Sequence, residues 1–319
     1  MVQPSPSGRG GCRYSPFVRK SHCVILSAVF LLYVFLLLSL ILPAPAANER
    51  LQRTVDAAMS NRRGAAVALD VETGQILAGY RMDVAARRLA APGSTIKPFT
   101  LMALLDAGLV HQNTALFCPR TVRIGNHVLD CSHPKTPESL DPVLALAYSC
   151  NYFFTKMTEG LTLDALPREF SRAGFGSITG KWPTELPSTI EPPKSKQGMQ
   201  LMSIGEENIK VTPLTLAEGY RSAIARPLRN PETAPPDLQI VLTGLEAVVN
   251  SGTGQAAKSS HVRVAGKTGT FSGHAWFAGF APAGKPEIVI VVFLEHGTGA
   301  ADAAPIAGRI LDGYYAPHP

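Results

Sequence analysis

The chain is poor in charged and in aromatic residues. Of its 319 residues 17% are charged and 7% are aromatic, whereas 45% are hydrophobic. This composition excludes an intrinsically disordered chain, which combines low hydrophobicity with high charge. The formal net charge of +6 falls to +2 for residues 48–319, because four basic residues lie before residue 23. Without a clustered basic face, the sequence gives no reason to expect a nucleic acid as a partner.

The sequence also lacks paired metal-ligand motifs. Its five cysteines form no C-x-x-C pair, and no H-x-x-x-H pair occurs. A zinc site made by Cys118, Cys131 and His133 is therefore disfavoured, and neither a metal nor a cofactor is expected. Cys118 and Cys131 flank a predicted hairpin at residues 121–129. The sequence leaves two alternatives for this pair, a disulfide across the hairpin or two buried, reduced thiols. Cys150 is expected to pack in the core as an inert thiol.

No acidic residue occurs before Glu49, and the longest apolar run lies in this acid-free part. The run covers residues 23–42 and is interrupted only by two serines. It is long enough to cross a bilayer core of roughly 30 Å, and the basic residues of 1–22 favour a cytoplasmic N-terminus. We therefore expect a transmembrane signal-anchor at 23–42 in a single-pass protein of the cell membrane, with residues 48–319 outside the cytoplasm. A cleaved signal peptide is the alternative, although the run exceeds the roughly 7–15 apolar residues of an ordinary signal peptide.

Residues 48–319 show the periodicities of one mixed domain. Helical patterns cover 48–60, 98–109, 141–158, 163–173, 213–224, 238–250 and 300–314, and strand patterns cover 64–70, 75–80, 121–129, 261–270, 275–280 and 288–294. This order predicts an α/β (α+β) three-layer sandwich, in which an antiparallel sheet of about five strands is flanked by helices. The segment from about 110 to 260 is expected to be an inserted, mostly helical subdomain.

Three short motifs occur in a fixed order after the first hairpin. Ser94 and Lys97 lie one helical turn apart at the start of an apolar helix, which lets an amine take the proton of a hydroxyl. They are followed by Ser149-Cys150-Asn151 and then by Lys267-Thr268-Gly269-Thr270. A second Ser-x-x-Lys pair, Ser132 and Lys135, precedes a proline-rich stretch and is expected to lie in a loop. Each motif alone has an ordinary structural explanation, such as a helix cap, but the ordered set favours a catalytic site.

The ordered motifs resemble the serine–lysine signature shared by penicillin-binding proteins and serine β-lactamases. The likeness extends to the flanks, because residues 92–99 are similar to the nucleophile segment of the penicillin-binding protein transpeptidase domain. Four more segments resemble sequence blocks of that family: residues 65–77, 211–214, 252–257 and 274–282. The resemblance covers essentially all of 48–319. Glu206 and Glu207 depart from the glycine- and glutamine-containing pattern that the family resemblance predicts after residues 203–205. The resemblance therefore does not predict the shape of this loop at the rim of the active-site cleft.

The resemblance implies a role for each motif residue. The predicted catalytic residues are Ser94 as the acylated nucleophile, Lys97 as its proton acceptor, Ser149 as the relay to the leaving amine, and Lys267 as a positive charge across the cleft. The predicted substrate-binding residues are Asn151, Thr268, Gly269 and Thr270. The backbone N–H groups of Ser94 and Thr270 would form the oxyanion hole. Lys97 can act as a base only when neutral, and burial near other cationic groups lowers the pKa of a lysine.

The implied activity is that of a D,D-transpeptidase, which forms an acyl-enzyme with D-Ala-D-Ala stem peptides, cross-links peptidoglycan and is acylated by β-lactam antibiotics. A serine β-lactamase is one alternative, but the Glu-x-x-Leu-Asn context of class A is missing between Ser149 and Lys267, and class D has an apolar residue where Asn151 stands. A D,D-carboxypeptidase would differ only in using water as the acyl acceptor. A non-catalytic β-lactam sensor would need a signalling module, for which few residues precede the apolar run. Peptidoglycan stem peptides and β-lactams are thus the expected ligands, and a separate glycan-polymerising protein is an expected partner.

Overall fold

The computed structural model describes residues 46–131, 133, 139–230, 232 and 234–317. The predicted cytoplasmic segment 1–22, the predicted span 23–42 and the second Ser-x-x-Lys pair at Ser132 and Lys135 lie outside these residues. In the part that is described, no helix combines the length and the apolar character needed to traverse a bilayer.

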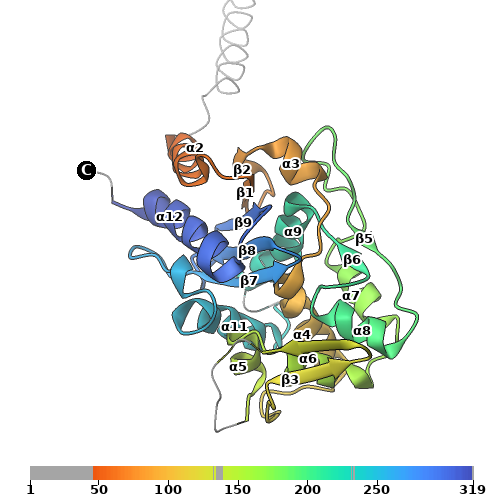
Figure 1. The fold of residues 1–319 in the computed structure, drawn as a ribbon. Helices are drawn as coiled ribbons and strands as arrows, with labels where there is room; N and C mark the ends of the chain where they lie inside the picture. The colour runs from red at the N-terminus through yellow and green to blue at the C-terminus, as the bar shows by residue number, and fades with distance from the viewer. Residues whose placement is uncertain (1–45, 132, 134–138, 231, 233, 318–319) are drawn as a thin grey trace, which may run out of the picture. The chain divides into compact units, whose positions relative to one another are not determined.

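A five-stranded antiparallel sheet forms the centre of the domain (Figure 1). The strand order is β2–β1–β9–β8–β7. The strands are β1 (Gly64–Asp70), β2 (Ile76–Tyr80), β7 (Ala265–Phe271), β8 (His274–Ala281) and β9 (Ile288–Leu294). The predicted first hairpin and the three predicted closing strands are confirmed. The edge strand β7 pairs with β8 alone among the described strands, and it carries the Lys267 motif.

The central strand β9 shows why the sheet is covered on both faces. All seven of its residues are buried. Val289, Val291 and Phe293 belong to one hydrophobic cluster, whereas the residues between them, such as Ile290 and Val292, belong to another. Side chains alternate across a strand, so a continuous apolar run requires packing partners on both sides. The predicted three-layer sandwich is therefore confirmed.

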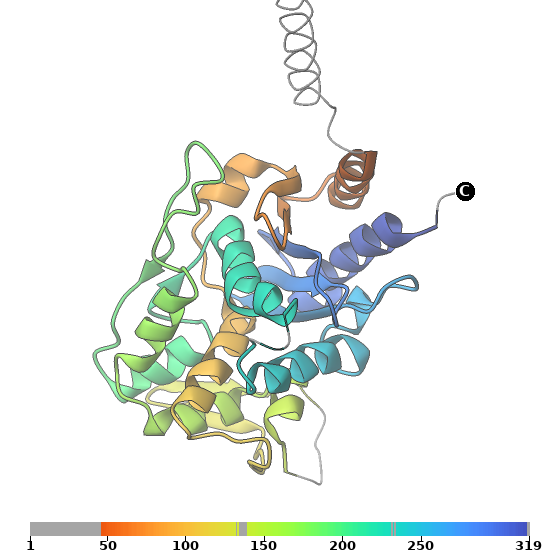
Figure 2. The same cartoon turned by 180° about the vertical axis from the view of Figure 1, so that it is seen from behind.

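The helices of the two outer layers come from distant parts of the chain. The terminal helices α2 (Ala46–Met59) and α12 (Ala304–Tyr315) pack against each other on one face of the sheet (Figures 1 and 2). In α2, Leu51, Val55 and Met59 recur every four residues and form its buried stripe. Helix α9 (Pro213–Tyr220) packs on the opposite face, against β1 and β9. The core on that side continues into the helices that follow Ser94 in the chain.

Among the described residues between α4 (Lys97–Asp106) and β7, helices are the predominant regular structure, but less than half of the segment is helical and it also contains two short antiparallel strand pairs. Its helices are α5 (Pro142–Ala147), α6 (Asn151–Met157), η2 (Thr158–Gly160), α7 (Ala165–Arg172), α8 (Lys196–Ser203), α9, η3 (Arg221–Ala225), α10 (Arg226–Leu228), α11 (Leu238–Asn250) and η4 (Gln255–Ala257). The strand pairs are β3 (Thr121–Ile124) with β4 (His127–Asp130), which confirms the predicted hairpin, and β5 (Thr189–Ile190) with β6 (Ile209–Lys210). The remaining elements are α3 (Met82–Arg87), η1 (Gly93–Ile96) and η5 (Gly299–Ala303).

The continuous helix expected over 141–158 is wrong. Helix α5 ends at Ala147, and α6 begins at Asn151. Between them Ser149 adopts a left-handed conformation with φ of 57°, which an α-helix cannot accommodate. The sulfur of Cys150 then caps α6 by accepting a hydrogen bond from the backbone N–H of Phe153. No glycine or proline marks this break in the sequence, so the periodicity gave no sign of it.

Candidate active site

Ser94 lies in the short turn η1, which leads directly into α4. Gly93 before it has a φ of 52°, in the region that favours glycine. A Cβ on Gly93 would lie 3.0 Å from the carbonyl oxygen of Thr270 and 3.2 Å from its backbone nitrogen. Gly269 is similarly tight, because a Cβ there would lie 2.6 Å from the carbonyl oxygen of Pro92. The two glycines therefore let η1, which bears the predicted nucleophile Ser94 and is called the nucleophile turn below, approach the backbone of β7.

Hydrogen bonds from both sides hold this turn in place. The indole N–H of Trp276 on β8 donates to the carbonyl oxygen of Ala91 (3.1 Å). The hydroxyl of Tyr220 on α9 donates to the carbonyl oxygen of Thr95 (2.8 Å). Because Trp276 and Tyr220 are themselves fully buried, the position of Ser94 is set by the sheet core rather than by a mobile loop.

Lys97 begins α4 and is fully buried. Its Nζ lies 2.8 Å from the carbonyl oxygen of Ser149, 3.2 Å from Ser149 Oγ and 2.7 Å from Asn151 Oδ1. It also lies 5.4 Å from the centre of the Phe154 ring. Burial lowers the pKa of Lys97 from 10.5 to about 8, because removing the ammonium from water disfavours its charge. A substantial neutral fraction at moderate pH is what a general base requires.

Lys267 approaches the same hydroxyl from β7. It is fully buried, and its Nζ donates to Ser149 Oγ (3.0 Å) and to the carbonyl oxygen of Thr268 (3.0 Å). Burial, and after it the positive charge of Lys97, hold the pKa of Lys267 well below its usual value. Ser149 Oγ therefore bridges two lysine amines that come from different elements.

This bridge provides a route for a proton. A neutral amine keeps two N–H donors, and the two shortest contacts of Lys97, to Ser149 O and Asn151 Oδ1, can use both of them. The lone pair of the amine then remains to take a proton. Since Ser149 Oγ contacts both amines, it can receive a proton from one side and pass one on.

The threonines of β7 lie beside the nucleophile turn. The hydroxyl of Thr268 shares a hydrogen bond with that of Thr253 (2.6 Å), and the hydroxyl of Thr270 accepts one from the backbone N–H of Gly299 (2.9 Å). Thr253 adds a hydroxyl that sequence reasoning had not assigned to the site. Its block, 252–257, had been noted as family-like, but only the fold brings it against β7.

The structure thus gathers most of the predicted site. Lys97, Ser149, Asn151 and Lys267 form one hydrogen-bonded group. The carbonyl oxygen of Ser94 accepts a hydrogen bond from the backbone N–H of Lys97, and the preceding residue Gly93 lies against the backbone of Thr270. Among the described residues, the hydroxyl of Ser94 makes no hydrogen bond to the side chain of Lys97. The predicted positions of Thr268, Gly269 and Thr270 along the same strand are confirmed, whereas the roles of all eight residues remain predictions.

Glu206, which departs from the expected pattern, lies close to this group. The carbonyl oxygen of Gly205 accepts a hydrogen bond from the backbone N–H of Gly93 (3.0 Å), so the rim loop is joined to the nucleophile turn. Burial raises the pKa of Glu206, and the positive charge of Lys97 opposes that rise. A carboxylate at this place therefore acts electrostatically on Lys97.

Residues 64–312 match the penicillin binding protein transpeptidase domain. The chain belongs to this family. The peptidoglycan D,D-transpeptidase MrdA of Acinetobacter baumannii is 28% identical over 82% of the chain and 52% of its own length, and FtsI of Escherichia coli K12 is 28% identical over 83% and 54%. The chain spans about half the length of the curated relatives it matches.

Solved structures of transpeptidases have the same fold. PBP2 from Pseudomonas aeruginosa superposes with a TM-score of 0.74 and 25% identity, over 83% of this chain and 76% of that one. The transpeptidase domain of penicillin-binding protein 3 from Burkholderia pseudomallei superposes with a TM-score of 0.74 at 23% identity, over 85% and 93%. The second likeness concerns the fold alone.

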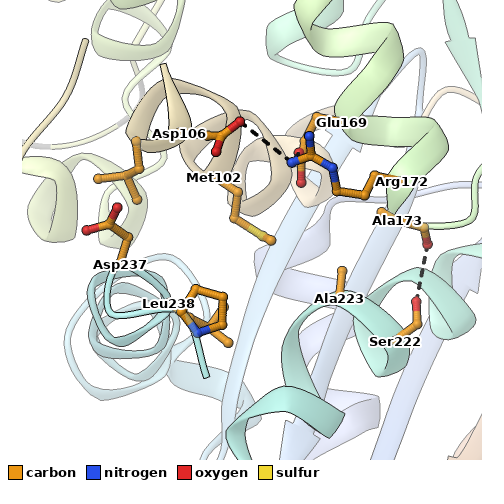
Figure 3. A pocket seen from close by; sticks show the side chains of 11 residues that line it. Met102, Asp106, Glu169, Arg172, Ala173, Ser222, Ala223, Asp237 and Leu238 are labelled. Carbon is orange, nitrogen blue, oxygen red and sulfur yellow. Dashed lines mark hydrogen bonds and ion pairs between the residues drawn. The ribbon is translucent and has the colours of Figure 1, made fainter. Parts of the chain in front are cut away.

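A separate cavity in this transpeptidase-family domain lies between α4, α7 and the start of α11 (Figure 3). It has a volume of about 330 Å³. Its polar wall is Arg172, whose guanidinium lies 2.8 Å from the carboxylate of Glu169 and 3.7 Å from that of Asp106. Asp106 ends the helix that Lys97 begins, so about 13 Å of helix separates the cavity from Lys97. Because this length of helix separates the cavity from Lys97, we assign the cavity no part in catalysis.

Proposed function

We propose that the chain is a serine-type D,D-transpeptidase that cross-links peptidoglycan through an acyl-enzyme. The observation that carries this proposal is the Ser149 hydroxyl held between the amines of Lys97 and Lys267, beside the turn that bears Ser94. Family membership and the names of the relatives, which are peptidoglycan D,D-transpeptidases, support the reaction class. D-Ala-D-Ala stem peptides, which the motif resemblance implies as the donor substrate, are part of the proposal.

In the proposed reaction, neutral Lys97 takes the proton of Ser94 as its oxygen attacks the carbonyl carbon between the two D-alanines. The backbone N–H groups of Ser94 and Thr270 stabilise the developing oxyanion, where one such donor is worth about 3–4 kcal/mol. Ser149 passes a proton to the departing D-alanine as the peptide bond breaks. An amine of a second stem peptide then attacks the acyl-enzyme ester and releases Ser94.

The proposed substrate geometry uses the edge of the sheet. Thr268 and Thr270, with Thr253, offer hydroxyl groups to the terminal carboxylate of the donor peptide, and Lys267 adds a positive charge nearby. Asn151 would hydrogen-bond the donor peptide through its side-chain amide. β-Lactams would enter by the same contacts, because they present a carbonyl to Ser94 and a carboxylate to the threonines.

We also propose that the apolar run 23–42 anchors the protein in the cell membrane, with the catalytic domain on the extracytoplasmic (periplasmic) side. The length of the run and the excess of basic residues before it support this placement. A glycan-polymerising protein is the proposed partner. Sizing the N-terminus of the membrane-extracted protein tests the anchor, because a cleaved leader would give a chain that starts after residue 42.

The experiment that tests the catalytic proposal is labelling of the full-length chain with a fluorescent penicillin. We expect labelled wild type, no labelling of Ser94→Ala and full labelling of Ser132→Ala. The second variant is a matched control, because it removes the serine of the other Ser-x-x-Lys pair. Thermal melting of each variant checks that the domain remains folded. Persistent labelling of a folded Ser94→Ala protein would refute Ser94 as the nucleophile.

The lifetime of the labelled species separates a transpeptidase from a β-lactamase. We expect the penicilloyl-enzyme to persist for hours, whereas rapid return of free enzyme would indicate hydrolysis by an activated water. Mass spectrometry of products formed from a donor stem peptide and an amine acceptor then separates cross-linking from carboxypeptidase activity. A product set that contains only the hydrolysed donor would contradict the transpeptidase proposal.

A further inference from the structure

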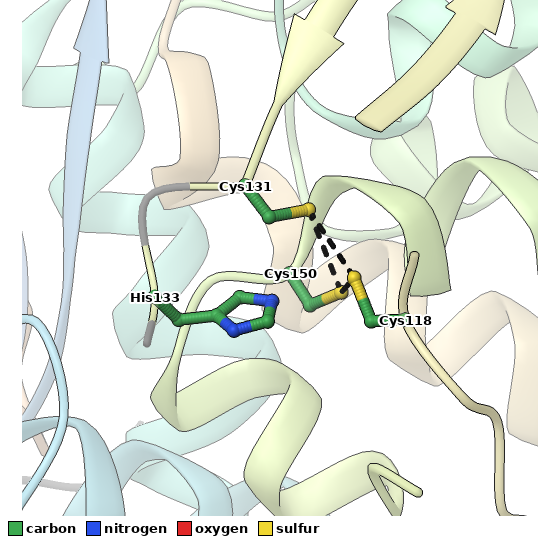
Figure 4. Close-up of side chains that lie close together, drawn as sticks. All are labelled: Cys118, Cys131, His133 and Cys150. Carbon is green, nitrogen blue, oxygen red and sulfur yellow. Dashed lines mark hydrogen bonds between the residues drawn. The ribbon is translucent and has the colours of Figure 1, made fainter. Parts of the chain in front are cut away.

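Three cysteines and one histidine meet in the core beside the catalytic group (Figure 4). Cys118 precedes β3, Cys131 and His133 follow β4, and Cys150 caps α6. All four are buried, with between 0% and 6% of each residue exposed. The expectation that Cys150 packs in the core is confirmed, but its thiol also contacts both other thiols, which the sequence spacing did not indicate.

The sulfur atoms form a compact triangle. Their separations are 3.6 Å for Cys118–Cys131, 3.8 Å for Cys131–Cys150 and 3.4 Å for Cys118–Cys150. The ligand atoms of these cysteines and of His133 all lie within 4.8 Å of one another. In a tetrahedral zinc site with Zn–S bonds of about 2.3 Å, two sulfur ligands lie about 3.8 Å apart. The observed triangle therefore fits around one zinc ion with little movement.

Each sulfur also accepts a hydrogen bond from a backbone N–H. The donors are Arg120 to Cys118 (3.3 Å), Tyr152 to Cys131 (3.5 Å) and Phe153 to Cys150 (3.4 Å). Such donors stabilise a negative charge on sulfur, and outer hydrogen bonds of this kind orient the ligands of a metal. Thiolates are the form in which cysteines bind metals.

A disulfide explains the cluster less well. All three cysteines are free thiols in the structure. One disulfide would use two of them and leave the third cysteine and His133 without a reason to converge. A set of three sulfurs and one imidazole nitrogen is instead a complete ligand set for a structural zinc site, with no position left open for substrate.

We propose that Cys118, Cys131, His133 and Cys150 bind one Zn²⁺ ion, and that this ion fixes the conformation of the Ser149–Asn151 segment. Cys150 lies between the two residues that hydrogen-bond Lys97, so a metal bond to its sulfur holds both of them. The ion also ties the β3–β4 hairpin, through Cys118 and Cys131, to the start of α6. The site is structural, and the acyl transfer itself takes place at Ser94.

Metal analysis of the full-length chain, purified without a histidine tag, tests the binding. We expect about one zinc per chain in the wild type and in Cys12→Ser, and strongly reduced zinc in Cys118→Ser and Cys131→Ser. Cys12→Ser is the matched control, because it removes a cysteine outside the cluster. In wild type reloaded with Co²⁺, we expect the visible absorption of tetrahedral cobalt bound to thiolates. The cobalt spectrum does not depend on whether the serine variants fold.

Three results would overturn the binding proposal. They are wild type that holds no zinc after dialysis against zinc, undiminished zinc in the folded serine variants, and a disulfide among the three cysteines in the freshly purified protein. None of them depends on the proposed acyl transfer, so the two proposals fail separately.

Removing the ion tests its role in positioning the Ser149–Asn151 segment. This experiment rests on the proposed function, because it measures acylation. A displacement of about 1 Å at a reacting group can cost roughly 10²-fold in rate. We expect zinc removal by a chelator to slow acylation by penicillin by about that factor, and zinc addition to restore the rate. Circular dichroism monitors whether the chelated protein stays folded. An acylation rate that is unchanged in zinc-free protein would refute the positioning role.

Discussion

At the scale of single residues, burial rather than charge alone makes the two lysines suitable for acid–base chemistry. Lys97 and Lys267 are both fully buried, and each has a pKa below its usual value mainly because of that burial. The hydroxyl of Ser149 gives them a shared partner. The rate of acylation should therefore follow the deprotonation of Lys97 and rise with pH through a pKa of about 8.

The substitution Glu206→Gln should shift that pH profile. The negative charge of Glu206 favours the ammonium form of Lys97 and so raises its pKa. Removing the charge lowers the pKa of Lys97, which moves the rising limb of acylation rate against pH to lower pH. The measurement is the second-order rate constant for a chromogenic β-lactam between pH 5 and 10. The exposed neighbour Glu207 provides the control, since Glu207→Gln should leave the limb in place, and a limb that moves to higher pH in Glu206→Gln would contradict the explanation.

Residue identities and order could be predicted from the sequence, but side-chain proximity could not. The Ser94, Ser149 and Lys267 motifs are separated by more than fifty residues each, and only their resemblance to a family grouped them. For the three core cysteines, neither the spacing nor the family resemblance grouped the residues. Cys118, Cys131 and Cys150 carry no regular metal-ligand spacing, so their convergence became visible only once the β3–β4 hairpin was placed against α6.

At the scale of elements, the site depends on the close approach of η1 to β7. This contact is made possible by glycine on both sides, Gly93 and Gly269, because the opposing backbone atoms leave no space for a Cβ. Burial of Trp276 under the turn supports it from β8. The distance between Ser94 and β7, the strand of Lys267, is thus fixed by backbone packing.

The substitution Gly269→Ala should therefore damage catalysis more than stability. Its Cβ would press on the carbonyl oxygen of Pro92 and push β7 from the nucleophile turn. Overpacking of this kind costs about 1–3 kcal/mol, whereas a misplacement of about 1 Å at the reacting groups can cost roughly 10²-fold in rate. Acylation rates and thermal melting of the variant measure the two effects.

Gly284→Ala is the matched control for this variant, because a Cβ there meets no atom within 4 Å. It should acylate like the wild type. If Gly269→Ala also retained the wild-type rate, the close approach of η1 to β7 would not be what sets the rate.

Most elements could be predicted because their apolar residues repeat clearly. The helix over 238–250 and the strand over 288–294 lie where the pattern placed them. The pattern failed at residues 148–150, where tertiary hydrogen bonds from Lys97 and a left-handed serine interrupt an otherwise helical sequence. Local propensity contains no information about such long-range partners.

At the scale of the whole domain, the sheet separates two hydrophobic cores, of which only one packs around the candidate active site. One core contains Phe99 and surrounds α4, and the other contains Ile306 of α12 and joins the two terminal helices to the sheet. The division was foreseeable from the continuous apolar run of β9. Which core supports the site was not, because it depends on which face α4 occupies.

Truncations in the two cores should separate stability from activity. Phe99→Ala and Ile306→Ala each empty a fully buried position, at a cost of about 3–5 and 2–5 kcal/mol respectively. Phe99 packs edge-on against Tyr220, whose hydroxyl holds the carbonyl of Thr95, so its loss should also slow acylation. Urea unfolding and acylation rates measure both properties. Equal acylation rates in the two variants, under conditions where both are folded, would refute the claim that only the core around α4 supports the active site.

The left-handed conformation of Ser149 has a consequence for the evolution of this chain. Non-glycine residues in that conformation carry a cost of order 1–3 kcal/mol, which glycine avoids. A mutation to glycine at this position would therefore be favoured by selection for stability and opposed by selection for proton transfer, since glycine has no hydroxyl. A descendant that no longer needed the proposed reaction would be released from the second constraint, and glycine would then exchange the hydrogen bonds of the Ser149 hydroxyl to Lys97 and Lys267 for relief of the backbone strain. The residue at position 149 is thus a marker by which active members and inactive descendants of this sequence could be told apart.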